Sequence, residues 1–145
     1  MFSRKLLAGL LVLLLAFPAW ANPTVVGSVV RSQAASVQGV RLATGSTLYS
    51  GDTIHVDAGG AARIALPDGA LIQLTENSLV QLAKYEATTQ LLVDRGSLAF
   101  RSTEKSPVEA LLGDATIRSA DDNLAVGIIQ MRSPDAAVIM AVQGR

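Results

Sequence analysis

Two stretches of the sequence decide its fold: GSTLYSGDTI at residues 45–54 and ARIALPDGALIQL at residues 62–74. In the second stretch, apolar and other residues alternate on either side of Pro67-Asp68-Gly69. These three residues predict a turn, because proline sets φ, aspartate accepts hydrogen bonds from nearby amides and glycine tolerates a positive φ. Side chains two apart in a strand share a face, so the flanking runs predict a β-hairpin with one apolar face. The residues of that face are Ala62, Ile64, Leu66, Ile72 and Leu74.

Turn signals of the same kind recur along the rest of the chain about every 8 to 12 residues, the spacing that all-β domains show. We therefore predict one all-β domain, a solenoid-like twisted roll or sandwich of roughly ten to twelve short strands. A helical turn at Pro107–Leu112 stays open as an alternative, because proline suits a first helical position and Gly113 a stop. The predicted structural turn residues are Gly45, Gly51, Asp52, Pro67, Asp68, Gly69 and Gly96.

The same patterns predict individual strands and a core. Gly27 interrupts a run of β-branched residues, which predicts a strand with a bulge at that glycine. Residues 37–42 are the next strand candidate. The core is predicted to include Val40, Leu42, Leu48, Ile54, Ile64, Leu66, Ile72, Leu74, Leu82, Val93, Leu98, Ile117, Val126, Ile128, Val138 and Met140.

Residues 1–21 have the features of a signal peptide. Arg4 and Lys5 precede an apolar run, and Ala19-Trp20-Ala21 is a small-x-small cleavage site formed by Ala19 and Ala21. The run stops at Pro18, short of the roughly 20 residues that a spanning helix needs. We therefore expect residues 22–145 to form the mature domain, which is either periplasmic or secreted. We expect no stable membrane anchor after cleavage, and no lipid anchor or disulfide, because the chain has no cysteine.

The distribution of charged and chemically reactive residues argues against several functions. Of the 12 basic residues, Arg4 and Lys5 belong to the signal peptide and the other 10 are scattered singly, which argues against nucleic-acid binding. His55 is the only histidine, and its one local companion is Asp57, too few ligands for zinc. Asp121-Asp122-Asn123 lacks the ligand spacing of a calcium loop, and no Gly-x-Ser-x-Gly elbow is present. We predict no catalytic residue, no cofactor and no metal site.

Several segments resemble the FecR domain of bacterial envelope proteins. They are Gly-Ser-x-Leu-x-x-Gly-Asp-x-Ile at residues 45–54, the Asp68-Gly69 turn with its alternating strand, Leu91–Leu98, and a closing strand at Ala137–Gly144. The resemblance covers the chain from about Val26 onward. It implies a periplasmic, non-catalytic module that binds or relays, as FecR-type domains do when they pass a signal from an outer-membrane receptor to a sigma factor.

Two features depart from the sigma-regulator arrangement of that family. We expect a cleavable signal where a cytoplasmic domain and a spanning helix would be, and we expect no receptor-contacting module after the domain. We therefore expect a free-standing periplasmic or cell-surface module that binds a protein or an envelope component. Whether it acts in sigma-factor signalling stays open. The alternative is a small-ligand-binding or carboxylate-based enzyme domain.

The C-terminal stretch at residues 136–142 is apolar at every position, unlike the alternating strands before it. Such a strand is buried on both faces or meets a partner. In the family, one more short strand usually follows this segment, and its absence would leave an edge unpaired. The possible interface residues are Val138, Ile139, Met140 and Val142. The expected partner is an envelope protein or polymer, or a second copy of the chain.

Overall fold

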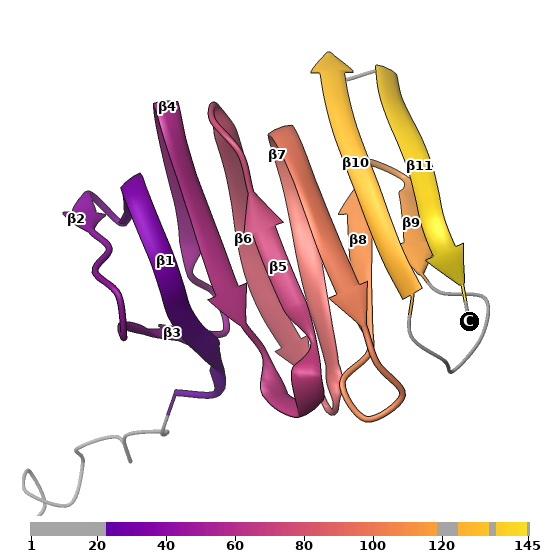
Figure 1. Ribbon diagram of the computed structural model, residues 1–145, viewed down its shortest axis with the longest axis horizontal. Helices are drawn as coiled ribbons and strands as arrows, with labels where there is room; N and C mark the ends of the chain where they lie inside the picture. The colour runs from indigo at the N-terminus through magenta and orange to yellow at the C-terminus, as the bar shows by residue number, and fades with distance from the viewer. Residues whose placement is uncertain (1–22, 119–124, 134–135, 145) are drawn as a thin grey trace, which may run out of the picture.

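A computed structural model describes residues 23–118, 125–133 and 136–144 of the chain. Within them, eleven strands are joined by hydrogen bonds into one continuous sheet (Figure 1). The strands are β1 Val25–Val37, β2 Val40–Arg41, β3 Thr47–Tyr49, β4 Thr53–Ala65, β5 Leu71–Leu74, β6 Ser78–Tyr85, β7 Thr88–Ser102, β8 Val108–Leu112, β9 Ala115–Arg118, β10 Ala125–Ser133 and β11 Ala136–Gly144, with a 3-10 turn η1 at Pro67–Gly69. The predicted all-β fold is confirmed.

The sheet folds over into two layers because three long strands run through both. The first part of β4 pairs with β6 and its last part with β5. Likewise, β7 pairs first with β6 and β8, then with β5 and β10. We call the two layers the β5 layer and the β6 layer. Strand β1 also runs through both layers. Its first part pairs with the last part of β4 in the β5 layer, and its last part pairs with the first part of β4 in the β6 layer.

Each long strand changes layer at a residue with a positive φ: Ala34 in β1 (51°), Gly59 in β4 (73°) and Gly96 in β7 (101°). The sequence marks Gly59-Gly60 and Asp94-Arg95-Gly96 as turn signals between strands. Instead, they bend strands that continue, because a single residue in the left-handed region redirects the backbone without ending its pairing. The three strands are therefore 13, 13 and 15 residues long, more than the short strands expected.

The predicted hairpin forms around η1. Ala62 pairs with Leu74, Ile64 with Ile72, and Arg63 with Gln73 on the opposite face. The Leu66 amide donates to the Ala70 carbonyl at 2.9 Å and closes the turn. The predicted bulge at Gly27 is also present, as a register shift against β3.

One apolar core lies between the layers. Its buried residues include Leu48, Ile54, Ile64, Leu66, Ile72, Leu74, Leu82, Val93 and Leu98, all as predicted, together with Phe100 and Ala110. Leu42 and Ile117 are only partly buried against this core. Val126, Ile128, Val138 and Met140 lie on β10 and β11, for which the structure describes the backbone pairing, so their place in the core stays a prediction.

The expectation that Val40 lies in the core was wrong. Val40 is 71% exposed, because β1 extends to Val37 and turns back at Gln38-Gly39, so that residues 37–42 form a hairpin tip rather than one strand. The alternative of a helical turn at Pro107–Leu112 is not what forms: Val108–Leu112 is strand β8, which pairs in parallel with β7. Its register places Val108 and Ala110 in the core, and this burial outweighs the helix-start signal of the proline.

Candidate functional site

The predicted turn residues occupy bends and tight connections. Gly45, Gly51, Gly69 and Gly96 have φ values of 90°, 98°, 81° and 101°, all in the region that favours glycine. A β-carbon at Gly45, Gly51 or Gly69 would meet no atom within 4 Å, so only the backbone conformation restricts those positions. Pro67 and Asp68 stand at the start of η1, where Asp68 also has a positive φ of 59°. These positions shape the scaffold.

Asp52 fastens its turn to strand β6. One carboxylate oxygen, Oδ2, accepts a hydrogen bond from the Tyr49 amide at 2.8 Å. The Asp52 carbonyl accepts from the Leu82 amide at 2.8 Å, and the Gly51 amide donates to the Leu82 carbonyl at 2.7 Å. Its carboxylate is thus used in a local turn, as aspartate commonly is.

His55 and Asp57 lie on one face of β4. The distance from His55 Nδ1 to Asp57 Oδ1 is 3.5 Å, and the side chains are 44% and 55% exposed. Within the described ranges, no three histidine or acidic side chains gather as metal ligands. Asp121-Asp122-Asn123 lies outside the described residues. His55 and Asp57 therefore form a solvated surface pair, which contributes little to stability.

A hollow lies over the β6 layer. It is open, has a volume of about 430 Å³, and is lined by residues that include Leu79, Gln81, Leu92, Asp94 and Leu111. Asp94 is the one carboxylate among its described lining residues, and it is exposed. Carboxylate-based hydrolysis commonly uses two acidic groups in different environments. This hollow therefore gives little support to the carboxylate-enzyme alternative.

The two ends of the folded sheet differ in how their edges are covered. At one end, the chain itself lies along β1: β2 and β3 pair with it, and between them the Leu42 amide donates to the Ala35 carbonyl at 2.9 Å. The loop before β3 adds two hydrogen bonds to β1. The Val29 amide donates to the Ser46 carbonyl, and the Gly45 amide donates to the Val29 carbonyl. At the other end, within the described residues, β11 pairs only with β10 and β9 only with β8.

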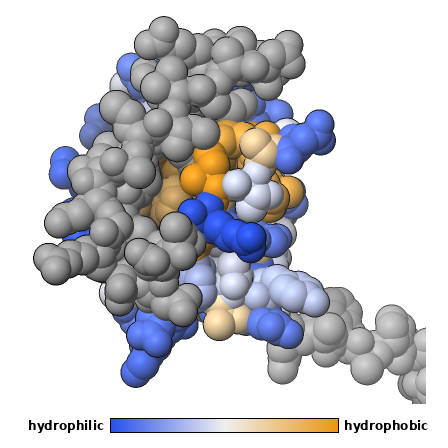
Figure 2. All heavy atoms as spheres, turned by 90° about the vertical axis from the view of Figure 1, so that its right-hand side faces the viewer, coloured by the Kyte–Doolittle hydropathy of each residue, from blue (hydrophilic) through white to orange (hydrophobic). Residues whose placement is uncertain are grey.

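Apolar surface is visible at the end where β8 to β11 lie. Figure 2 looks onto this end and shows apolar atoms of described residues reaching the surface. Leu112 on β8 and Ile117 on β9 are partly buried there against the core. The predicted interface residues Val138, Ile139, Met140 and Val142 belong to β11. Val138, Ile139 and Met140 pair with Gln130, Ile129 and Ile128 of β10.

The family comparison agrees with this architecture. A model of the FecR family, described as FecR protein, matches residues 52–139, more than half of the chain. The chain belongs to the FecR family. The FecR match begins at the Gly51-Asp52 turn and ends within β11. No curated protein and no solved structure matches the chain.

The resemblance seen in the sequence is thus confirmed. FecR is a family of envelope-associated regulatory and signalling domains. Among the described residues, no helix has the length and apolar character needed to cross a membrane. The cleavage-site residues Ala19 and Ala21 lie outside the described part of the chain.

One arrangement of charged residues could not be read from the spacing of the basic side chains along the sequence. The strand pairing brings Arg31, Arg63 and Arg101, which are far apart in the chain, to the outer face of the β5 layer. No local cluster of basic residues in the sequence indicates this arrangement. One signal was available: Arg63 and Gln73 oppose each other in the predicted hairpin and point away from its apolar face.

Proposed function

We propose that this FecR-family chain is an exported, non-enzymatic envelope module that binds another protein along strand β11. The observation that carries the proposal is the contrast between the two edges of the sheet. The outer edge of β1 is covered by residues 40–49 of the same chain, whereas β11 has one described neighbour, β10.

An edge strand presents unpaired backbone amides and carbonyls to its surroundings. Proteins usually protect such edges with short strands, charges, proline or a covering segment. β11 spans nine residues, Ala136–Gly144, and residues 136–142 carry neither a charge nor a proline. A partner strand could add its backbone hydrogen bonds to this edge and cover its apolar side chains, the mode known as β-augmentation.

Site-specific photo-crosslinking in the bacterial envelope tests this proposal. We expect a crosslinker at Val142 to form an adduct with one protein, which mass spectrometry of the adduct identifies. A crosslinker at Tyr85, which is 69% exposed on β6 at a distance from β11 in sequence and pairing, serves as the control. Equal crosslinking at both positions, or none at Val142, would contradict the proposal.

Two pairs of lysine substitutions test which face of β11 is involved. Ala137→Lys with Ile139→Lys alters one face, and Val138→Lys with Met140→Lys the other, because successive strand side chains alternate. Circular dichroism reports folding, and light scattering reports self-association. We expect one pair to stay folded and lose the Val142 adduct. If both pairs unfold, β11 is a core strand and its side chains are not an interface. An adduct with twice the mass of the chain would identify the partner as a second copy.

A further inference from the structure

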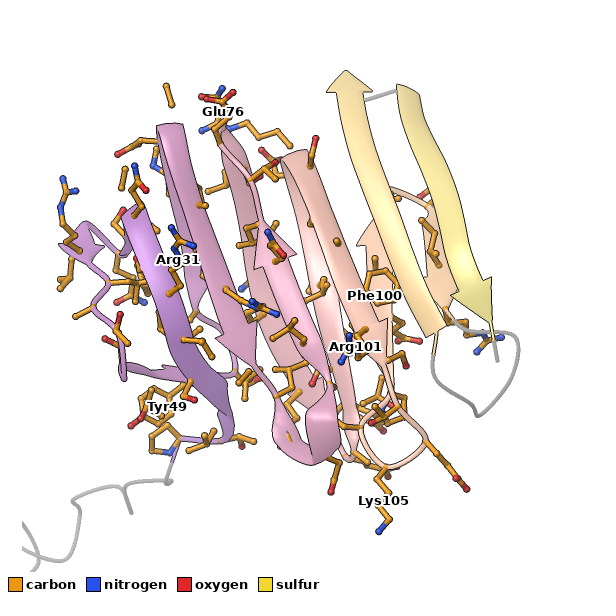
Figure 3. The ribbon with its side chains drawn as sticks, viewed as in Figure 1. Arg31, Tyr49, Glu76, Phe100, Arg101 and Lys105 are labelled. Carbon is orange, nitrogen blue, oxygen red and sulfur yellow. The ribbon has the colours of Figure 1, made fainter. Side chains whose placement is uncertain are left out.

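Three arginines lie on the outer face of the β5 layer. Arg31 on β1 pairs directly with Arg63 on β4, and Arg63 pairs with Gln73 on β5. Gln73 pairs with Ala99 on β7, two residues before Arg101. All three arginines and Gln73 are exposed, and Figure 3 shows Arg31 at β1 and Arg101 at β7. We call Arg31, Arg63, Gln73 and Arg101 the arginine face.

A β-bulge at Val30 produces the closest pair of this face. Val29 pairs with Ile64 and Arg31 with Arg63, so Val30 is the extra residue. With regular pairing, Val30 would oppose Arg63, and Arg31 would oppose Ala62 on the buried side. The bulge instead leaves both Val30 and Arg31 exposed. It places two arginines opposite each other on strands about 5 Å apart, an arrangement that destabilises a sheet unless something compensates it.

No described acidic side chain compensates these charges. Within the described residues no arginine pairs with a carboxylate, and the one histidine–carboxylate contact joins His55 and Asp57 in the β6 layer. Glu76 lies at the end of the strands (Figure 3), where its carboxylate accepts from the Gly59 amide at 2.7 Å. The arginine face is therefore a positively charged surface without a described counter-charge.

Two shallow hollows flank Arg63 and share Gln73. One, of about 190 Å³, is lined by Arg63, Leu71, Gln73, Ala99, Phe100 and Arg101. The other, of about 100 Å³, is lined by Arg31, Gln33, Ala61, Ala62, Arg63 and Gln73. Each hollow is lined by two arginines and at least one glutamine, and its other lining residues have apolar side chains. Their size suits a short carboxylate side chain.

We propose that the arginine face binds an acidic, extended segment of a protein partner. This inference rests on the proposed function, that the chain binds a protein, and adds the chemistry of the segment recognised. Guanidinium groups bind carboxylates through paired N–H donors, and arginine clusters are a recurring means of recognising acidic motifs. Glutamines beside them can bond the peptide backbone of the same segment.

The composition of this face favours a peptide over a sugar polymer or a membrane. Sugar binding commonly uses exposed aromatic rings, and the aromatic residue here, Phe100, is buried. Membrane-surface binding commonly uses lysine clusters with protruding apolar groups. The described lining of both hollows contains arginine and no lysine.

An NMR titration of the mature protein tests the proposal. The probe is a blocked peptide of about seven residues that alternates glutamate and serine, with a glutamine–serine peptide as its neutral counterpart. We expect saturable amide shifts on β1, β4, β5 and the second half of β7 with the acidic probe alone. Affinity should fall when salt rises from about 50 mM to about 300 mM, because exposed charges are screened.

Matched variants assign the binding to these arginines. The double variant Arg31→Gln with Arg63→Gln should lower the affinity for the acidic peptide by about tenfold or more. The control, Arg41→Gln with Arg118→Gln, should change that affinity by less than about twofold. Arg41 and Arg118 are exposed arginines on β2 and β9, so the control removes the same charge. Amide spectra of each variant verify that it is folded.

Three results would overturn the proposal: no saturable shift, equal binding of the neutral peptide, or shifts elsewhere than on these strands. Tighter binding, through the same arginines, of phosphatidylglycerol vesicles or of an anionic polysaccharide would also overturn it. If the Val142 adduct forms but the acidic peptide does not bind, the arginine-face proposal is wrong and the proposed contact along β11 stands. Peptide binding without the Val142 adduct would remove β11 as the contact edge and leave the arginine face.

Discussion

The hydroxyl of Ser78 bridges the backbone of Ser97 in both directions. It donates to the Ser97 carbonyl at 3.1 Å and accepts from the Ser97 amide at 3.3 Å. Ser78 is completely buried, and the neighbouring Gly96 lies against it so closely that a β-carbon there would overlap its side chain. This contact holds β7 against β6 at the residue where β7 passes between layers.

Gly96→Ala should therefore be strongly destabilising. The added methyl group meets Ser78, and the backbone φ of 101° is unfavourable for alanine. We expect a loss of about 2–5 kcal/mol in the free energy of unfolding, measured by urea denaturation. Gly113→Ala is the control, since φ is 58° there and no atom lies within 4 Å; it should lose only about 1–2 kcal/mol. Equal losses would show that the contact with Ser78 is unimportant.

Gly69→Val should destabilise through the backbone alone. φ is 81° at Gly69, and open space surrounds the position, so a β-branched residue is restricted by conformation and not by packing. We expect a loss of about 1–3 kcal/mol in urea denaturation. Gly69→Asn should lose less, because asparagine adopts positive φ more readily. A valine variant as stable as the parent would mean that this turn does not constrain the hairpin.

Arg63→Gln should leave the fold intact and slightly raise its stability at low ionic strength. It removes the like-charge pairing with Arg31 across β1 and β4. We expect a gain of about 0.2–0.5 kcal/mol in the free energy of unfolding, which high salt abolishes by screening. Arg41→Gln, away from this pair, should show no such gain. Destabilisation by Arg63→Gln at low salt would contradict the view that these arginines serve recognition.

Removing divalent metals should not change thermal stability. His55 and Asp57 form an exposed pair without further described ligands. We expect the melting temperature to be the same with and without a chelator, by differential scanning calorimetry. A fall of several degrees that zinc or calcium restores would point to a site that includes His55 or Asp121-Asp122-Asn123.

Export should produce a mature chain that begins at Asn22. The charged start, the apolar run and Ala19-Trp20-Ala21 support this prediction. Mass spectrometry of the protein purified from the envelope fraction measures the first residue directly. A form that retains Met1 in the inner membrane would show that residues 1–21 are an anchor.

The sequence by itself determined the local parts of this fold. Alternating apolar residues and the Pro67-Asp68-Gly69 turn set the β4–β5 hairpin and its register, because strand periodicity and turn geometry depend on near neighbours. The same local patterns showed the bulge at Gly27 and the family. The same patterns predicted turns at Gly59 and Gly96, where strands β4 and β7 in fact continue. A glycine with a positive φ has the same sequence signature in a bent strand as in a turn between two strands.

Only the tertiary structure decided which distant segments meet. The exposure of Val40 and the burial of Val108 and Ala110 on β8 each depend on what packs beside them, as does the pairing of β11, whose one neighbour among the described residues is β10. The arginine face is the clearest case. Arg31 and Arg63 are neighbours because a bulge at Val30 shifts the pairing of two strands by one residue. Register across two strands depends on contacts between segments that are distant in sequence, so no pattern around either arginine encodes this shift.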